Sequence, residues 1–166
     1  MAVIFDLIEV TDISENTTYS AEAGNLLGVV DNVSSAQLDD GEFDERTDDL
    51  LIDGVSYTID RIQEPASNGT FTLGDGSTQD YSPNILEGNL NVVFLTVSHG
   101  DDVRHFIIPN DGYGDMNLQS LDTGSIRDVG ASDAGVISET NNSINMVCFV
   151  TGSMIDTPDG GTAVEE

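Results

Sequence analysis

Short apolar runs, alternating or continuous, recur along the chain and predict β-strands. After the hairpin-type turn Asp53-Gly54, residues 55–60 alternate apolar and polar side chains, which is typical of a half-buried strand. Residues 90–109 hold two β-rich runs on either side of Gly100-Asp101-Asp102, which indicates a second hairpin. The first of these runs is almost continuously apolar over residues 92–97, so we expect a central strand with both faces covered.

The remaining apolar runs are shorter, and polar or Gly/Asp-rich stretches separate them. We expect strands over residues 2–10, 25–33 and 69–73, a polar loop over residues 11–23, and a short strand or a helical turn over residues 116–129. No long segment keeps a period of 3.6 residues. The pattern predicts an all-β fold, a sandwich or barrel of short antiparallel strands.

The composition changes near the C-terminal end of the chain. Residues 130–145 are small and polar, as flexible linkers are. We therefore expect an acidic β-sandwich domain at 1–130, a flexible linker at 131–147 and a separate fragment at 148–166.

The C-terminal fragment has the pattern of a β-hairpin. Residues 144–155 have the apolar, partly β-branched composition of a strand. Thr157-Pro158-Asp159-Gly160 predicts a tight turn, because proline presets φ and glycine accepts a positive φ. Residues 162–164 can return as the partner strand.

Cys148 is the only cysteine in the chain. A lone cysteine in a strand is usually a small buried hydrophobe, but the neighbours of Cys148 favour another interpretation. The run CFVTGSMIDTPDG, from Cys148 to Gly160, resembles the first motif of bacterial Hint (Hedgehog/intein) domains. Ala163-Val164-Glu165 stands where that family carries a PVE-type segment.

This resemblance implies a self-processing reaction at the Val147–Cys148 bond. The thiol of Cys148 would attack the carbonyl carbon of Val147 and form a thioester, an N–S acyl shift. The family supplies the necessary hydrogen-bond donors from a downstream Thr-x-x-His motif and a terminal His-Asn. Residues 149–166 contain neither, so self-cleavage is expected only where a complete Hint domain follows Glu166. No catalysis is expected from residues 1–147, and the upstream Thr-x-x-His at residues 96–99 is interpreted as coincidence.

The charge balance changes the list of expected partners. The chain has 31 acidic residues, four arginines and no lysine, and its net charge is −27. Such a surface repels phosphate backbones and anionic lipids, so we expect neither nucleic-acid binding nor membrane insertion. Three interpretations of the acid excess stay open: a solvated face that keeps the protein soluble in salty water, divalent-cation binding, and a surface for a basic partner.

Calcium is the candidate cofactor, because carboxylate and carbonyl oxygens suit Ca²⁺. The densest acidic run covers residues 37–49, and a Gly/Asp loop covers residues 110–115. The candidate ligands in these two segments are Asp39, Asp40, Glu42, Asp44, Asp111 and Asp115. Neither segment has the EF-hand spacing or a tandem nonapeptide repeat, so plain solvated loops are the competing interpretation.

Two histidines flank the second hairpin turn. His99 and His105, together with Asp101 and Asp102, have donor types that bind metals, although two histidines at a hairpin end are more often hydrogen-bonded surface residues. No Ser-His-Asp or paired-Glu spacing points to a hydrolase, and nothing points to a lectin-like site.

The function predicted from these patterns is that of a passenger domain released by a Hint-type reaction. It would serve as a secreted or surface module with protein partners or self-assembly. Residues 52–60 (IDGVSYTID) and the acidic run before them resemble passenger regions attached to Hint domains in marine alphaproteobacteria, which implies an extracellular place in a saline setting. The N-terminus lacks the positive region of a signal peptide, so export would use a signal beyond Glu166 or another route. Two alternatives stay open: a structural component of a virion or extracellular filament without processing, and a Ca²⁺-dependent binding domain.

Overall fold

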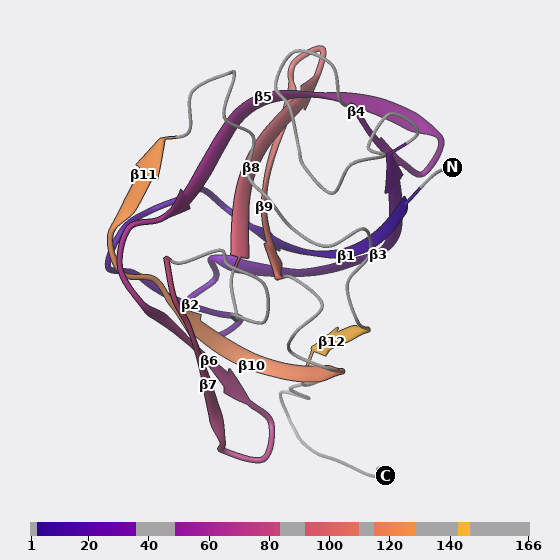
Figure 1. The fold of residues 1–166 in the computed structure, drawn as a ribbon. Coiled ribbons are helices and arrows are strands. Elements are labelled where there is room, and N and C mark those ends of the chain that lie inside the picture. The colour runs from indigo at the N-terminus through magenta and orange to yellow at the C-terminus, as the bar shows by residue number, and fades with distance from the viewer. Residues whose placement is uncertain (1–2, 36–48, 84–91, 110–114, 129–142, 147–166) are drawn as a thin grey trace, which may run out of the picture.

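The computed structural model describes residues 3–35, 49–83, 92–109, 115–128 and 143–146, and within these ranges the regular structure is entirely β (Figure 1). The all-β prediction is therefore confirmed. No helix of the length and hydropathy that a membrane span requires occurs in these ranges. In chain order the strands are β1 (Val3–Val10), β2 (Thr18–Ser20), β3 (Leu26–Ser35), β4 (Asp49–Ile52), β5 (Val55–Pro65), β6 (Gly69–Leu73), β7 (Thr78–Tyr81), β8 (Val92–His99), β9 (Asp102–Pro109), β10 (Met116–Asp122), β11 (Ile126–Asp128) and β12 (Ile144–Met146).

The first sheet closes into a barrel. Its strands follow the order β5-β4-β3-β1-β9-β8, every pairing is antiparallel, and β8 returns to pair with β5. Closure leaves none of these strands as a free edge along its whole length. The short β11 adds to the C-terminal half of β5 outside the ring.

The second sheet is smaller and lies against the barrel wall, below the barrel in Figure 1. Its order is β12-β10-β6-β7, and β2 also pairs with β10. The pairing of β12 with β10 is parallel, whereas β10 pairs antiparallel with β2 and β6. The protein is thus both a barrel and a sandwich, because one part of the barrel wall serves as the second layer.

Two hydrophobic cores follow from this arrangement. The first draws buried residues from all six barrel strands and fills the barrel interior. The second lies between the barrel wall and the small sheet, and joins wall residues such as Ile8, Phe94 and Ile107 to Phe71 and Leu118 of the small sheet. A fully buried side chain of this size contributes about 1.5–3 kcal/mol relative to an exposed one, so both cores are large terms in the stability.

Strand β8 shows how the sequence pattern leads to two cores. Val93, Leu95 and Val97 belong to the barrel interior, whereas Val92 and Phe94 belong to the core against the small sheet. The prediction that residues 92–97 are covered on both faces is confirmed. The Asp53-Gly54 turn is also confirmed, with φ of 51° and 79° at its two residues, the paired positive values of a tight hairpin turn.

Two short strands differ from the predicted elements. Strand β2 lies inside the predicted polar loop at 11–23, and β7 lies in a stretch where no strand was expected. Strand β12 agrees with the start of the strand composition noted over residues 144–155, although it overlaps the linker predicted at 131–147. These three strands have three or four residues each; β2 and β12 pair with β10, and β7 pairs with β6. Residues 129–142 and the predicted hairpin fragment 148–166 lie outside the described residues.

A close contact between a glycine and a tyrosine joins β6 to β7. Gly69 is directly opposite Tyr81, whose ring is 1 % exposed. A Cβ atom built on Gly69 would overlap that ring. A strand glycine covered by a cross-strand aromatic ring is a recognised way to stabilise an otherwise weak position.

We expect Gly69→Ala to destabilise the protein by about 1–3 kcal/mol, because the methyl group must displace the packed Tyr81 ring. At about 2–4 °C per kcal/mol, calorimetry will detect the loss as a lower Tm. Tyr81→Leu removes the ring, so the added cost of Gly69→Ala should shrink in the Tyr81→Leu background. Equal costs in both backgrounds would contradict the packing argument.

We also expect stability to fall above about pH 10. Burial raises the pKa of Tyr19 and of Tyr81 in the folded protein, whereas an unfolded tyrosine ionises near its ordinary value of about 10. The unfolded state therefore releases these protons first. The corresponding stability is complete below that pH and is lost as pH rises further. Urea unfolding between pH 8 and 11 measures the loss, and Tyr81→Phe should reduce it. Normal titration of all four tyrosines by absorbance in the folded protein would refute the prediction.

Candidate processing junction

Strand β12 is the described element next to the predicted scissile bond. Val147 and Cys148 lie outside the described residues, and β12 ends at Met146. Ile144 is buried, and Met146 packs against the core between the two sheets. The residues that lead into the junction therefore belong to the folded body.

Asp6 anchors β12 across 138 residues of sequence. The Ile144 N–H donates a hydrogen bond of 2.9 Å to Asp6 Oδ2, in a buried setting. Asp6 is on β1 and is only 8 % exposed. It alternates with Phe5 and Leu7, which face the barrel interior, so its carboxylate faces the small sheet. A buried carboxylate needs hydrogen-bond donors. A hydrogen bond from a backbone N–H to a charged acceptor typically contributes about 1.5–3 kcal/mol to stability.

Backbone contacts at Ser143 extend this anchor. The Met116 N–H donates to the Ser143 carbonyl oxygen at 3.0 Å, and the Ser143 N–H donates to Asp115 Oδ1 at 3.1 Å. Asp115 is the one predicted calcium ligand within the described residues, and its observed role is to hold the start of β12. The other five, Asp39, Asp40, Glu42, Asp44 and Asp111, lie outside the described residues.

Strands β12 and β2 share one edge of β10. Strand β6 occupies the other edge of β10, opposite residues 118–122. On the shared edge β12 pairs with residues 116–118, and β2 pairs with residues 120–122. Figure 1 shows the two strands at opposite ends of β10. Only Gln119 separates the two pairings along this edge.

Each of the two histidines has a hydrogen-bond partner in the protein. His99 Nδ1 lies 3.2 Å from the Ser56 carbonyl oxygen, and His105 Nδ1 lies 3.0 Å from Thr96 Oγ1. Within the described ranges, no group of three or more His, Cys, Asp or Glu side chains is arranged to hold a metal ion. The structure brings His99 close to Tyr57, with 5.8 Å between ring centroids, rather than to His105.

A polar cluster lies at the end of the barrel next to the β8–β9 turn. Arg104 donates two hydrogen bonds to the Glu9 carboxylate, from Nε at 2.9 Å and from Nη2 at 2.8 Å. These bonds raise the pKa of Arg104 above its ordinary value. The guanidinium carbon also lies over the rings of Tyr57 and Phe106, at 5.4 and 5.2 Å from their centroids. The Tyr57 hydroxyl donates to Asp102 Oδ2 at 2.7 Å.

Sequence reasoning did not identify this cluster. Glu9 and Arg104 are 95 residues apart, and nothing in either segment marks them as partners. The available signal was a charged residue within each of two strand patterns. It did not single out this pair, because Asp6 interrupts the same pattern as Glu9 and binds β12 of the small sheet instead. The charged and hydroxyl groups of the cluster are hydrogen-bonded to one another at this end of the barrel.

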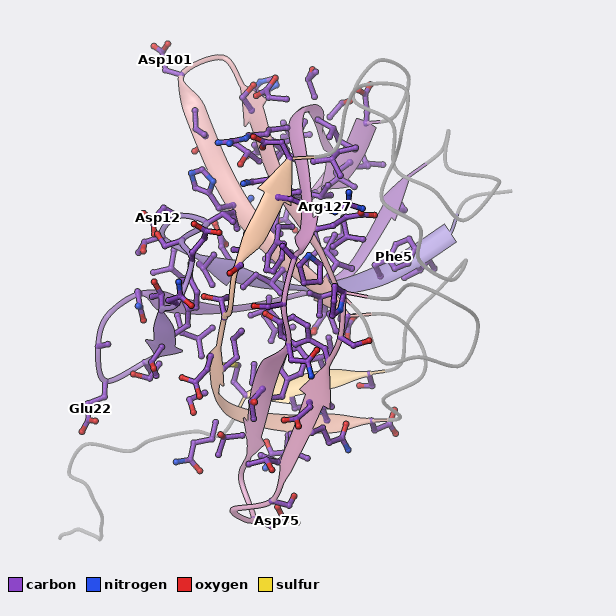
Figure 2. All side chains as sticks on the ribbon, turned by 60° about the vertical axis from the view of Figure 1, so that its left-hand side comes forward. Phe5, Asp12, Glu22, Asp75, Asp101 and Arg127 are labelled. Atoms are coloured by element: carbon purple, nitrogen blue, oxygen red, sulfur yellow. The ribbon has the colours of Figure 1, made fainter. Side chains whose placement is uncertain are left out.

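All three described arginines are bound to carboxylates. Besides the Arg104–Glu9 pair, Arg127 pairs with the buried Glu64 at 2.7 Å, and the exposed Arg61 pairs with Asp128 at 2.7 Å. The hydrogen bonds from Arg61 lower the pKa of Asp128. Acidic side chains elsewhere project from the turns, as Figure 2 shows at three of the tips, Glu22, Asp75 and Asp101. The described surface is therefore strongly anionic.

Comparison with protein-family models, with curated proteins and with solved structures found no match to this chain.

We expect Asp6→Ala to loosen β12 specifically. The substitution leaves the buried Ile144 N–H without its carboxylate acceptor, which should lower the free energy of unfolding by about 1–3 kcal/mol. Hydrogen exchange at the Ile144 amide should accelerate more than exchange at β8 amides. Asp101→Ala removes the same charge at an exposed turn and serves as the control. Unchanged protection of Ile144 in Asp6→Ala would contradict the anchoring role.

Proposed function

We propose that residues 1–147 are the passenger of a Hint-type autoprocessing protein, released at the Val147–Cys148 bond. The passenger performs no catalysis. After release it serves as a secreted or surface module that acts through protein partners or self-assembly.

The observation that carries this proposal is in the sequence: the run from Cys148 to Gly160 resembles the first motif of Hint domains. The described fold up to Met146 is compatible with it. A release reaction at Val147–Cys148 would leave this fold with every described strand, because the cut falls after β12.

The proposed chemistry is an acyl shift followed by release. The Cys148 sulfur attacks the Val147 carbonyl carbon, the C–N bond breaks, and the proton lost by the thiol balances the one gained by the new amine. The first product is a thioester isomer of the chain. Attack by water or another nucleophile then frees the passenger and restores the thiol. The donors that polarise the scissile carbonyl would come from the rest of a Hint domain.

The surface of the passenger favours a non-enzymatic role. Its described arginines are all paired, and its described histidines are hydrogen-bonded within the fold. A strongly negative surface keeps the released module soluble and repels other anionic surfaces. Such a surface suits a basic protein partner or an extracellular setting where salt screens the repulsion.

In the full-length precursor, we expect intact-mass analysis to find a species that ends at Val147. Cys148→Ala should abolish it, because the alanine side chain cannot form a thioester. An added thiol such as dithiothreitol should accelerate release from the wild type by attacking that thioester. Asp101→Ala, far from the junction in sequence, should process normally. A wild-type chain that stays intact beyond Glu166 would instead favour the structural component of a virion or filament.

A further inference from the structure

Strand β7 is the last strand on one side of the small sheet. It pairs with β6 along one edge, and within the described ranges no strand pairs with its other edge, the outer edge of β7. Figures 1 and 2 show the β6–β7 hairpin projecting away from the barrel, with Asp75 at its tip. An edge strand presents backbone N–H and C=O groups with which another strand can pair.

The β6–β7 ladder determines which backbone groups of β7 face its outer edge. The Leu73 N–H donates to the Ser77 carbonyl oxygen at 2.9 Å, so these two residues form a hydrogen-bonded pair. Hydrogen-bonded and non-hydrogen-bonded pairs alternate along an antiparallel ladder. Gln79 therefore directs its N–H and C=O toward β6, whereas Thr78 and Asp80 direct theirs toward the outer edge.

The face of the small sheet that is turned away from the barrel carries hydroxyl and carboxylate groups in cross-strand rows. One row consists of Thr18, Asp122, Thr70 and Asp80, and the next consists of Ser20, Ser120, Thr72 and Thr78. In the first row, Thr18 and Thr70 each donate a hydrogen bond to an aspartate on the neighbouring strand. Within these rows every carboxylate thus has a hydroxyl group beside it, and no two carboxylates are directly opposite each other.

The sequence of β7 is self-complementary in one antiparallel register. A second copy that pairs about Gln79 places Thr78 opposite Asp80 of that copy, and Asp80 opposite its Thr78, which repeats the pairing of hydroxyl with carboxylate. Both residues direct their backbone groups outward, so each of these pairs can exchange two hydrogen bonds.

The neighbouring registers are less favourable. Pairing about Asp80 would place two carboxylates directly opposite each other, which is destabilising. Pairing about Thr78 would bring the turn residue Gly76, whose φ is 88°, into the ladder. A shift by one residue would place the side chains of the second copy on the opposite face. The register about Gln79 is therefore the favoured one.

Gln79 supplies an independent observation at the same edge. Its side-chain Oε1 is buried, and no donor within the described residues forms a hydrogen bond with it. In the register about Gln79, the two Gln79 side chains belong to a non-hydrogen-bonded pair, in which opposite side chains are closest. Once turned toward the edge, each amide can donate from Nε2 to Oε1 of the other.

We propose that two copies of this chain associate by antiparallel pairing of β7 with β7 about Gln79, when salt screens their charge. This inference rests on the self-assembly role proposed above and identifies the partner as a second copy, related by a two-fold axis. The net charge of −27 on each copy opposes association. The Debye length falls from about 10 Å at 0.1 M salt to about 3 Å at 1 M, so association should strengthen as salt rises.

Sedimentation velocity of the 166-residue chain at about 0.1 M and about 1 M NaCl tests the proposal. We expect a dimer Kd at least about tenfold lower at the higher salt. Thr78→Pro removes an outward N–H that the β6–β7 ladder does not use, so this variant should keep the wild-type Tm and stay monomeric at both salt concentrations. A folded Thr78→Pro variant that dimerises like the wild type would overturn the proposal.

Charge placement tests the register without removing a backbone donor. Thr78→Lys puts a cation opposite Asp80 of the second copy, twice by symmetry, and should lower the dimer Kd by about 2–30-fold. Thr72→Lys makes the same change in net charge on the same face, one strand further from the edge, and is the matched control. Equal gains for the two variants would overturn pairing about Gln79.

The outcomes separate this inference from the proposed processing. If the wild-type chain is monomeric at both salt concentrations, pairing through β7 is overturned, whereas release at Val147 is measured independently in the precursor. If the chain dimerises as expected and the precursor is never cleaved, the processing step fails and the β7 interface stands.

Discussion

Burial of the barrel wall on both faces is the constraint on which the rest of the structure depends. Strands β1, β8 and β9 send alternate side chains into the barrel interior and into the core against the small sheet. A single wall supplies residues to both cores, so its strands are covered on both faces. The small sheet is the second layer that covers the outer face of this wall.

The scarcity of basic residues gives each described arginine a defined structural role. Arg104 neutralises Glu9 at the barrel mouth, where an unpaired carboxylate next to the interior would be costly. Arg127 reaches the buried Glu64, and Arg61 ties β5 to β11 through Asp128. Among the other described acidic groups, Glu22, Asp75 and Asp101 are at exposed turns, where water and salt reduce their mutual repulsion (Figure 2).

The candidate junction could be predicted from the sequence only in part. The Hint-like run that begins at Cys148 is a local sequence motif, so it was sufficient to predict Val147–Cys148 as the candidate scissile bond. The role of Asp6 could not be predicted, because its contact with Ile144 joins opposite ends of the chain. The strand composition of residues 144–155 indicated a strand at residues 144–146, but its parallel pairing with β10 could not be predicted, because the two strands are distant in sequence. Among the predicted calcium ligands, Asp115 has a hydrogen-bonding role that spacing alone did not suggest.

By itself the sequence determined the all-β class, the longer strands, the tight turn at Asp53-Gly54 and the double burial of residues 92–97. Those features depend on side-chain alternation and on backbone preferences within a few residues, which are local properties. Closure of the barrel through β5 and β8, the parallel docking of β12 and the ion pair between Glu9 and Arg104 were decided only by the tertiary structure. Each joins segments that are distant in sequence, and no local pattern records which strand edges and charged groups will meet once the chain is compact.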